Sequence, residues 1–133
     1  EKGYINPEAV KIPSWIIKWL KDTFMSKAES FDCSNKIFID RKDDTKFKHC
    51  QIINDDEVFE FLKSKGFAKY KVGQLSFKKQ IYLFNNAEVI IGPHGAAFAN
   101  LAFCNPGTRV IEFKPFGLIV IKPLIFILLI FLI

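Results

Sequence analysis

The sequence has little of the residue types that build disulfide frameworks and metal centres. Its three cysteines, Cys33, Cys50 and Cys104, lie far apart and form no CxxC pair. It has two histidines, and no run of His, Cys, Asp and Glu has the spacing of metal ligands. We therefore expect reduced, structural thiols, a cytoplasmic setting, no bound metal and no resident cofactor.

The phosphate-binding motifs of the large nucleotide-binding families are also missing. Neither GxxxxGK[ST] nor GxGxxG occurs, so a P-loop ATPase or a dinucleotide-binding domain has no motif support. The chain starts at Glu1 with no initiator Met, no basic and apolar leader and no small-residue cleavage site, so we predict no targeting segment there. We expect a piece of a longer protein.

The charge balance leans towards the positive. Nineteen Lys and Arg against 14 Asp and Glu give a formal net charge of +5, which favours an anionic partner such as phosphate, nucleic acid or an acidic membrane surface. The basic residues are spread along the chain, and solvated helix faces account for most of them. Charge therefore does not lead us to predict nucleic-acid binding.

Helical and strand patterns alternate along the chain. The length suits one domain. Apolar residues at helical spacing predict helices over 13–27, 55–65, 77–86 and 96–103, and short β-rich runs predict strands over 36–40, 67–72, 88–91 and 109–113. We expect Asn54 or Asp55 to cap the second helix, Gly66 to end it and Ser76 to open the third. This order predicts an α/β domain with a Rossmann-like parallel sheet and helices on both faces.

One strand-to-helix turn carries the pattern that is most specific for a ligand. Ligands of parallel sheets bind beyond the carboxyl ends of the strands, where the loop from Arg41 and the turn GPHGAA, residues 92–97, are expected. Gly92 and Gly95 permit close approach of a ligand to the backbone, and the helix start at Ala96 and Ala97 favours binding of an anion. His94 is a candidate donor to a phosphate or a candidate base; the alternative is a histidine that only hydrogen-bonds within the turn.

The region around this turn resembles a known enzyme family. The run AEVIIGPHGAAFANLAFCNPGTRVIEF, residues 87–113, closely resembles the C-terminal signature of the glycosyltransferase 61 family, which transfers sugars from nucleotide-sugar donors. The resemblance continues upstream through IFIDRKD, IINDDEVFEFLKSKGF and LSFKKQIYLFNNA, so that it covers roughly residues 37–115. Several matched blocks in the same order are far more specific for the family than a His-Gly-Ala motif alone.

The resemblance implies a fold and an activity. It implies a GT-B type enzyme with two Rossmann-like halves, in which residues 1–115 form the donor-binding C-terminal half and an N-terminal half is missing. It further implies a metal-independent transferase that generally inverts the sugar carbon. The partners would be a nucleotide-sugar donor, which is a substrate and not a cofactor, and a glycan or polysaccharide acceptor.

Individual positions carry the resemblance into candidate roles. Arg41 matches the arginine after the first strand, His94 the family's HGA turn, Asn100 its AxxN step and Glu112 its acidic strand position. The candidate substrate-binding residues are thus Arg41, Gly92, Gly95, Ala96, Ala97, Asn100 and Glu112. Arg41 and the amides of residues 95–97 would hold the diphosphate, and His94 would be catalytic. Glu112 would accept from a ribose hydroxyl; the alternative is a strand-end carboxylate in an ion pair.

Two segments depart from the family pattern. Cys50 lies near a position where the family usually has an arginine, so that either Lys48 or His49 supplies the charge or donor binding is weakened. We do not expect Cys50 to be a nucleophile.

The tail FGLIVIKPLIFILLIFLI, residues 116–133, would barely span a hydrocarbon core of roughly 30 Å as a helix. A spanning helix, a membrane-surface segment and an ending altered by a frameshift all remain open. Two other interpretations of the whole chain also remain: a non-catalytic or decayed nucleotide-sugar-binding module, and a membrane-anchored interaction protein.

Overall fold

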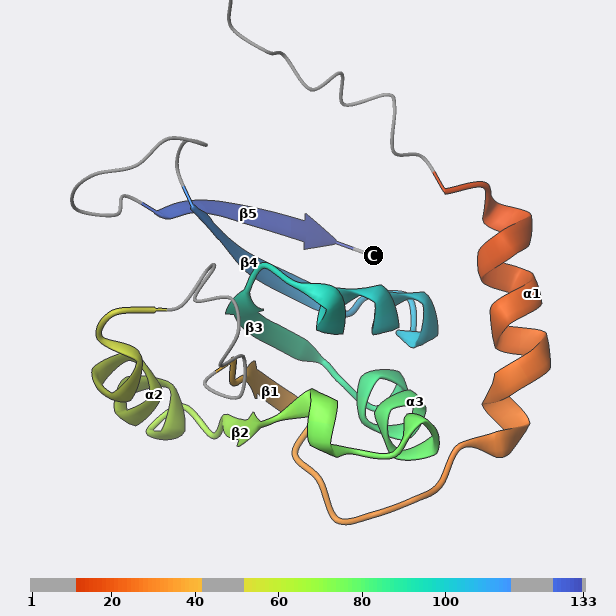
Figure 1. Cartoon of the computed structure of the whole chain (residues 1–133), viewed down its shortest axis with the longest axis horizontal. Coiled ribbons are helices and arrows are strands. Elements are labelled where there is room, and N and C mark those ends of the chain that lie inside the picture. The colour runs from red at the N-terminus through yellow and green to blue at the C-terminus, as the bar shows by residue number, and fades with distance from the viewer. Residues whose placement is uncertain (1–11, 42–51, 116–125, 133) are drawn as a thin grey trace, which may run out of the picture.

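The computed structural model describes residues 12–41, 52–115 and 126–132 (Figure 1). The described α-helices are α1 (Ser14–Phe24), α2 (Asp55–Lys63) and α3 (Phe77–Asn85), and the 3₁₀ helices are η2 (Met25–Lys27), η3 (Val72–Gln74) and η4 (Ala96–Phe103). The described strands are β1 (Lys36–Ile39), β2 (Ala68–Tyr70), β3 (Val89–Pro93), β4 (Arg109–Pro115) and β5 (Phe126–Leu132). The predicted alternation of strands and helices is confirmed.

The strands form one sheet in the order β2-β1-β3-β4-β5 (Figure 1). The pairs β1·β2, β1·β3 and β3·β4 are parallel, as predicted for an α/β domain. The chain leaves β1 for β2 on one side and then crosses back over β1 to β3 on the other. The strand order therefore reverses between β1 and β3, and ligands of such sheets bind beyond the carboxyl ends of the strands at a reversal of this kind.

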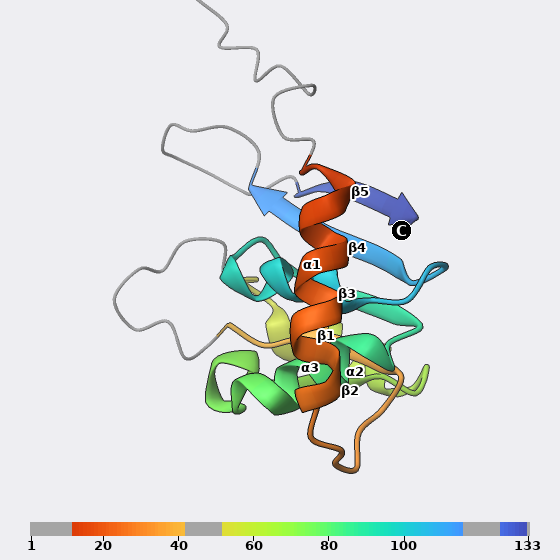
Figure 2. The same ribbon diagram turned by 90° about the vertical axis from the view of Figure 1, so that its right-hand side faces the viewer.

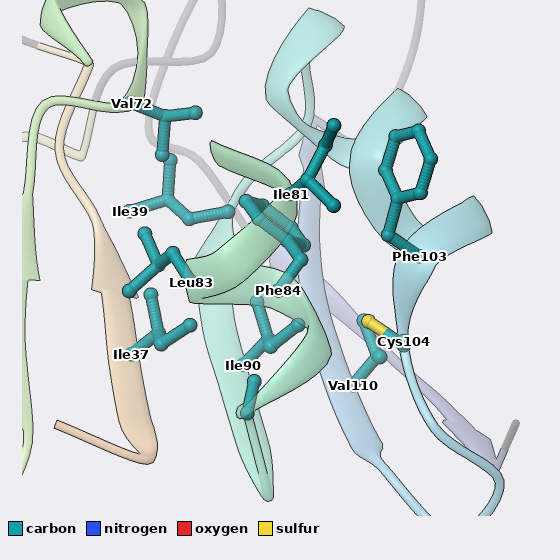
Figure 3. Packing of buried hydrophobic residues seen from close by; sticks show 11 residues of the cluster. Ile37, Ile39, Val72, Ile81, Leu83, Phe84, Ile90, Phe103, Cys104 and Val110 are labelled. Atoms are coloured by element: carbon teal, nitrogen blue, oxygen red, sulfur yellow. The ribbon is translucent and has the colours of Figure 1, made fainter. Parts of the chain in front are cut away.

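Alternating side chains of the strands build a core on each face of the sheet. The register aligns Ile37 with Ile90, and Ile90 with Val110, in one row across β1, β3 and β4. These side chains and Ile39 pack with residues of α3 and η4, as Figure 3 shows, and each fully buried one contributes about 1.5–3 kcal/mol. The opposite face carries Phe38 and Ile91 beneath α2, so the prediction of helices on both faces is confirmed.

Helix α1 covers the outer side of the larger core. It lies beside α3 and η4 in both views (Figures 1 and 2) and packs Leu20 and Phe24 against that core. Its other face leaves Trp15 and Trp19 exposed, at 68% and 55% of their surface. Most of the surface of these two aromatic side chains therefore lies outside the core, although aromatic residues at helical spacing usually pack on a core.

Two local features differ from the predictions. Strand β2 is shorter than predicted, because Val72 turns into η3 instead of continuing the strand. Asn54 occupies the N-cap position of α2 without a side-chain cap, and the carboxylate of Asp55 instead pairs with Lys69 at 2.7 Å. The predicted role of Ser76 is confirmed, since its side chain accepts from the Lys79 amide at 3.3 Å. Helix α2 ends at Lys63, and the turn that follows it contains Gly66 with a φ of 85°.

Residues 126–132 of the apolar tail form an edge strand and not a helix. Strand β5 runs antiparallel to β4. Arg109 pairs with Leu132 at one end of the two strands, and Pro115 pairs with Phe126 at the other. In the part of the chain that the structure describes, no helix has the length and apolar character needed to cross a membrane. Residues 116–125 lie outside the described residues.

Candidate functional site

The two predicted ligand loops meet where the strand order reverses. Strand β1 ends at Ile39 and leads through Asp40 to Arg41, while the neighbouring β3 ends at Pro93 and leads to His94. The guanidinium of Arg41 donates through Nη1 to the backbone carbonyl of His94. The two loops that the sequence predicts are thus in direct contact, through a hydrogen bond between residues 53 positions apart.

Gly95 leaves room for the Arg41 side chain. A Cβ atom at position 95 would lie 1.9 Å from Nη1 and 2.6 Å from Cζ of Arg41, and both distances are far shorter than non-bonded contacts. The backbone of Gly95 is extended, with a φ of 166°, so its conformation does not require glycine. The missing side chain therefore serves the packing of the arginine over the turn.

Gly92 has a similar role within the sheet. A Cβ atom there would lie 2.7 Å from the Cβ of Ile39 on the neighbouring strand. The predicted reason for both glycines was close approach of a ligand to the backbone. In the structure, protein atoms of Arg41 and Ile39 occupy the space beside Gly95 and Gly92.

The His94 side chain is held by a buried carboxylate. Its Nδ1 lies 2.5 Å from Oε1 of Glu112, and the other carboxylate oxygen, Oε2, lies 3.2 Å from Nζ of Lys114. The Glu112 side chain is 9% exposed, whereas that of His94 is 55% exposed. Of the two interpretations of Glu112, the ion pair is thus present in the structure.

Backbone contacts fix the position of His94 as well. Its amide donates to the carbonyl of Phe113 at 2.8 Å, which ties the end of β3 to β4. The next residues begin η4 at Ala96, with Gly95 as the N-cap and no side-chain cap. The first amides of a helix have no partner within the helix, so those of Ala96 and Ala97 form an electropositive helix start next to Arg41.

Asn100 has a different environment from the other candidate residues. It is 7% exposed, and its Nδ2 donates to Oε1 of Gln80 at 2.9 Å and to the carbonyl of Ala97 at 3.2 Å. The three-residue repeat of a 3₁₀ helix places Ala97, Asn100 and Phe103 in one line facing the core. The structure therefore gives Asn100 a contact that joins η4 to α3.

The described thiols are protonated at neutral pH. Burial raises the pKa of Cys104 to about 11, and the nearby Lys21 lowers it only in part. Burial, together with the charge of Asp32, also raises the pKa of Cys33. Both thiols are free, which agrees with the predicted structural role. Cys50, Lys48 and His49 lie outside the described residues.

Lys114 is a site residue that the sequence interpretation missed. The available signal was the two-residue period of the strand, which places Lys114 on the same face as Glu112. Among residues 12–41, 52–115 and 126–132, no group of three or more His, Cys, Asp or Glu side chains is placed so that it could hold a metal ion.

The geometry defines a class of protein: an α/β domain with an arginine, a histidine and a helix start gathered at the reversal of strand order, where such domains bind phosphate-containing ligands. The family model of glycosyltransferase 61 matches residues 4–111, and the chain belongs to this family. Membership implies glycosyltransferase activity in general terms. No curated protein matches the chain with significance.

Proposed function

We propose that the chain binds the diphosphate of a nucleotide-sugar donor at the carboxyl ends of β1 and β3, where the strand order reverses. The observation that carries this proposal is the contact between Arg41 and the His94 carbonyl, which brings a permanent positive charge to the start of η4. Arginine and helix amides recognise phosphate oxygens through charge-assisted hydrogen bonds. We infer the sugar on this diphosphate from the membership of the chain in glycosyltransferase 61.

The same groups would assist the transfer step. As the acceptor hydroxyl oxygen bonds to the sugar carbon with inversion, the hydroxyl gives up its proton to water. The bond from that carbon to the diphosphate oxygen breaks, and negative charge grows on the leaving group. Arg41 and the amides of Ala96 and Ala97 stabilise this charge, and His94 in its protonated form donates to the same phosphate. No metal is needed in this scheme, because the protein itself provides the positive groups.

We further propose that the domain is the donor-binding half of a GT-B type enzyme and that its acceptor is a glycan or polysaccharide. The support is the set of four parallel strands, whose single reversal of order offers a place for one substrate of a two-substrate reaction. A second domain would then provide the surface that binds the acceptor.

Nucleotide titration tests the donor site directly. UDP and GDP are added separately to the ¹⁵N-labelled 133-residue chain, and amide shifts are followed by NMR. The largest shifts are expected at Arg41 and at residues 94–97. Arg41→Ala should reduce these shifts at equal nucleotide concentration, whereas Lys63→Ala, which removes an exposed cation at the end of α2, should not. Absence of binding at millimolar nucleotide, or shifts centred elsewhere, would refute the proposal.

A further inference from the structure

Glu112 is a buried carboxylate with a basic group on each of its oxygens. An ionised carboxylate at 9% exposure is costly unless charge and hydrogen bonds compensate for the lost water. His94 supplies one contact at 2.5 Å and Lys114 the other at 3.2 Å. The ammonium of Lys114 beside one oxygen and the imidazole of His94 beside the other together stabilise the negative charge of the carboxylate.

This arrangement decides which nitrogen of His94 carries a proton. An ionised carboxylate only accepts hydrogen bonds, so the contact between Nδ1 and Glu112 requires a proton on Nδ1. The neutral ring is therefore the Nδ1–H form, and Nε2 is the nitrogen that gains or loses a proton. The backbone of His94 is fixed at the same time, through its amide to Phe113 and its carbonyl to Arg41.

We propose that Glu112 is a positioning residue that holds the His94 ring with Nδ1 protonated and so assigns Nε2 to the phosphate ligand. The part of this inference that concerns the ligand rests on the proposed function; the part that concerns the proton position does not. Lys114 acts one step further out, since it holds the second oxygen of the carboxylate and keeps the first one turned towards His94.

Imidazole ¹⁵N shifts measure the proton position directly. The experiment uses the 133-residue chain with labelled histidine, and His49→Gln removes the other histidine signal. Above the titration of the ring, His94 should show a protonated Nδ1 and an unprotonated Nε2. Glu112→Ala should move the proton to Nε2, the form that free histidine prefers in water.

Two further variants separate the role of the acceptor from that of the charge. Glu112→Gln keeps an oxygen that can accept from Nδ1 and should retain the Nδ1–H form, although the amide no longer stabilises the charged ring. Glu88→Ala removes an exposed carboxylate at the amino end of β3 and should leave the His94 shifts unchanged. A wild-type ring protonated at Nε2 would overturn the inference, and this readout does not depend on whether Glu112→Ala folds.

UDP affinity then connects the proton position to function. Glu112→Ala should weaken UDP binding about tenfold, in line with the loss of one charge-assisted hydrogen bond from a misplaced ring, and Glu112→Gln should weaken it less. Affinity unchanged in a folded Glu112→Ala chain would overturn the link between Nε2 and the phosphate. If the wild-type chain shows the expected Nδ1–H form but binds no UDP, the proposed function fails and the positioning role of Glu112 stands.

Discussion

The guanidinium of Arg41 lies where a side chain of residue 95 would otherwise be, since a Cβ on Gly95 would approach Nη1 to 1.9 Å. This relationship makes the glycine and the arginine one unit. It also couples the loop after β1 to the turn after β3, the two segments that form the proposed phosphate site.

The first prediction concerns this unit. Gly95→Ala should push the Arg41 side chain away from the turn and weaken UDP binding about tenfold or more, comparable to losing one charged hydrogen-bond donor. Stability should change little, because the extended backbone of residue 95 accepts alanine and an arginine side chain can move. Isothermal titration calorimetry and a thermal melt measure the two effects.

A double variant provides the control. Adding Gly95→Ala to Arg41→Ala should cost no further affinity, since the glycine matters only through the arginine. Additive losses would mean that Gly95 contacts the nucleotide itself, which is the original interpretation from the sequence.

Gly92→Ala should act on stability instead. The added Cβ would lie 2.7 Å from Ile39 Cβ and 3.4 Å from its Cα, so the strands must separate, and overpacking of this kind costs about 1–3 kcal/mol. Urea unfolding measures this loss. Gly95→Ala is the matched control, because its added Cβ meets the end of the flexible Arg41 side chain and not a neighbouring strand, so its unfolding free energy should change little. Equal losses in the two variants would contradict the packing argument.

Much of the fold follows from local patterns in the sequence, because strands buried on both faces and helices with one apolar side have distinct periods. The meeting of Arg41 and His94 was expected only in outline, as two loops at one edge of the sheet. Their direct contact depends on the strand order β2-β1-β3-β4, which no local pattern encodes. The link between Glu112 and His94 depends on the same pairing of β3 with β4.

Asn100 shows where a motif match and a structure assign different roles. The sequence placed it among the substrate-binding residues, but its amide joins η4 to Gln80 of α3. Asn100→Ala should therefore lower the free energy of unfolding by about 1–3 kcal/mol, because Gln80 and the Ala97 carbonyl lose a buried partner. UDP affinity of the folded variant should stay within twofold of wild type. A large loss of affinity at unchanged stability would restore the binding role.

The raised pKa of Cys104 predicts a loss of stability in alkali. The thiol is protonated in the folded and the unfolded chain below its ordinary pKa of 9.0, and between that pH and the raised pKa of about 11 only the unfolded chain loses the proton. Folding stability should therefore fall across this window by roughly 2–3 kcal/mol and level off above it. Urea unfolding of wild type and Cys104→Ala at several pH values isolates the effect, since lysine titration is common to both. Parallel curves would show that burial does not perturb this thiol.

The last prediction concerns strand β5, whose seven pairs with β4 make residues 126–132 part of the sheet. Alternate amides of β4 point towards β5 and the others towards β3, because a strand between two neighbours divides its hydrogen bonds between them. Deleting the chain after Pro115 should speed hydrogen exchange at the β5-facing amides and leave the β3-facing ones protected.

The shortened chain should also associate in a concentration-dependent way, as an unpaired edge strand offers a template for pairing. Ultracentrifugation measures this association. A charged replacement at Ile111 cannot serve as the control, because Ile111 packs against the core beneath α2. Deletion of residues 1–11 is the control for shortening the chain. If the tail were a membrane anchor and not an edge strand, exchange in β4 would be the same with and without it, and only the full chain would float with lipid vesicles.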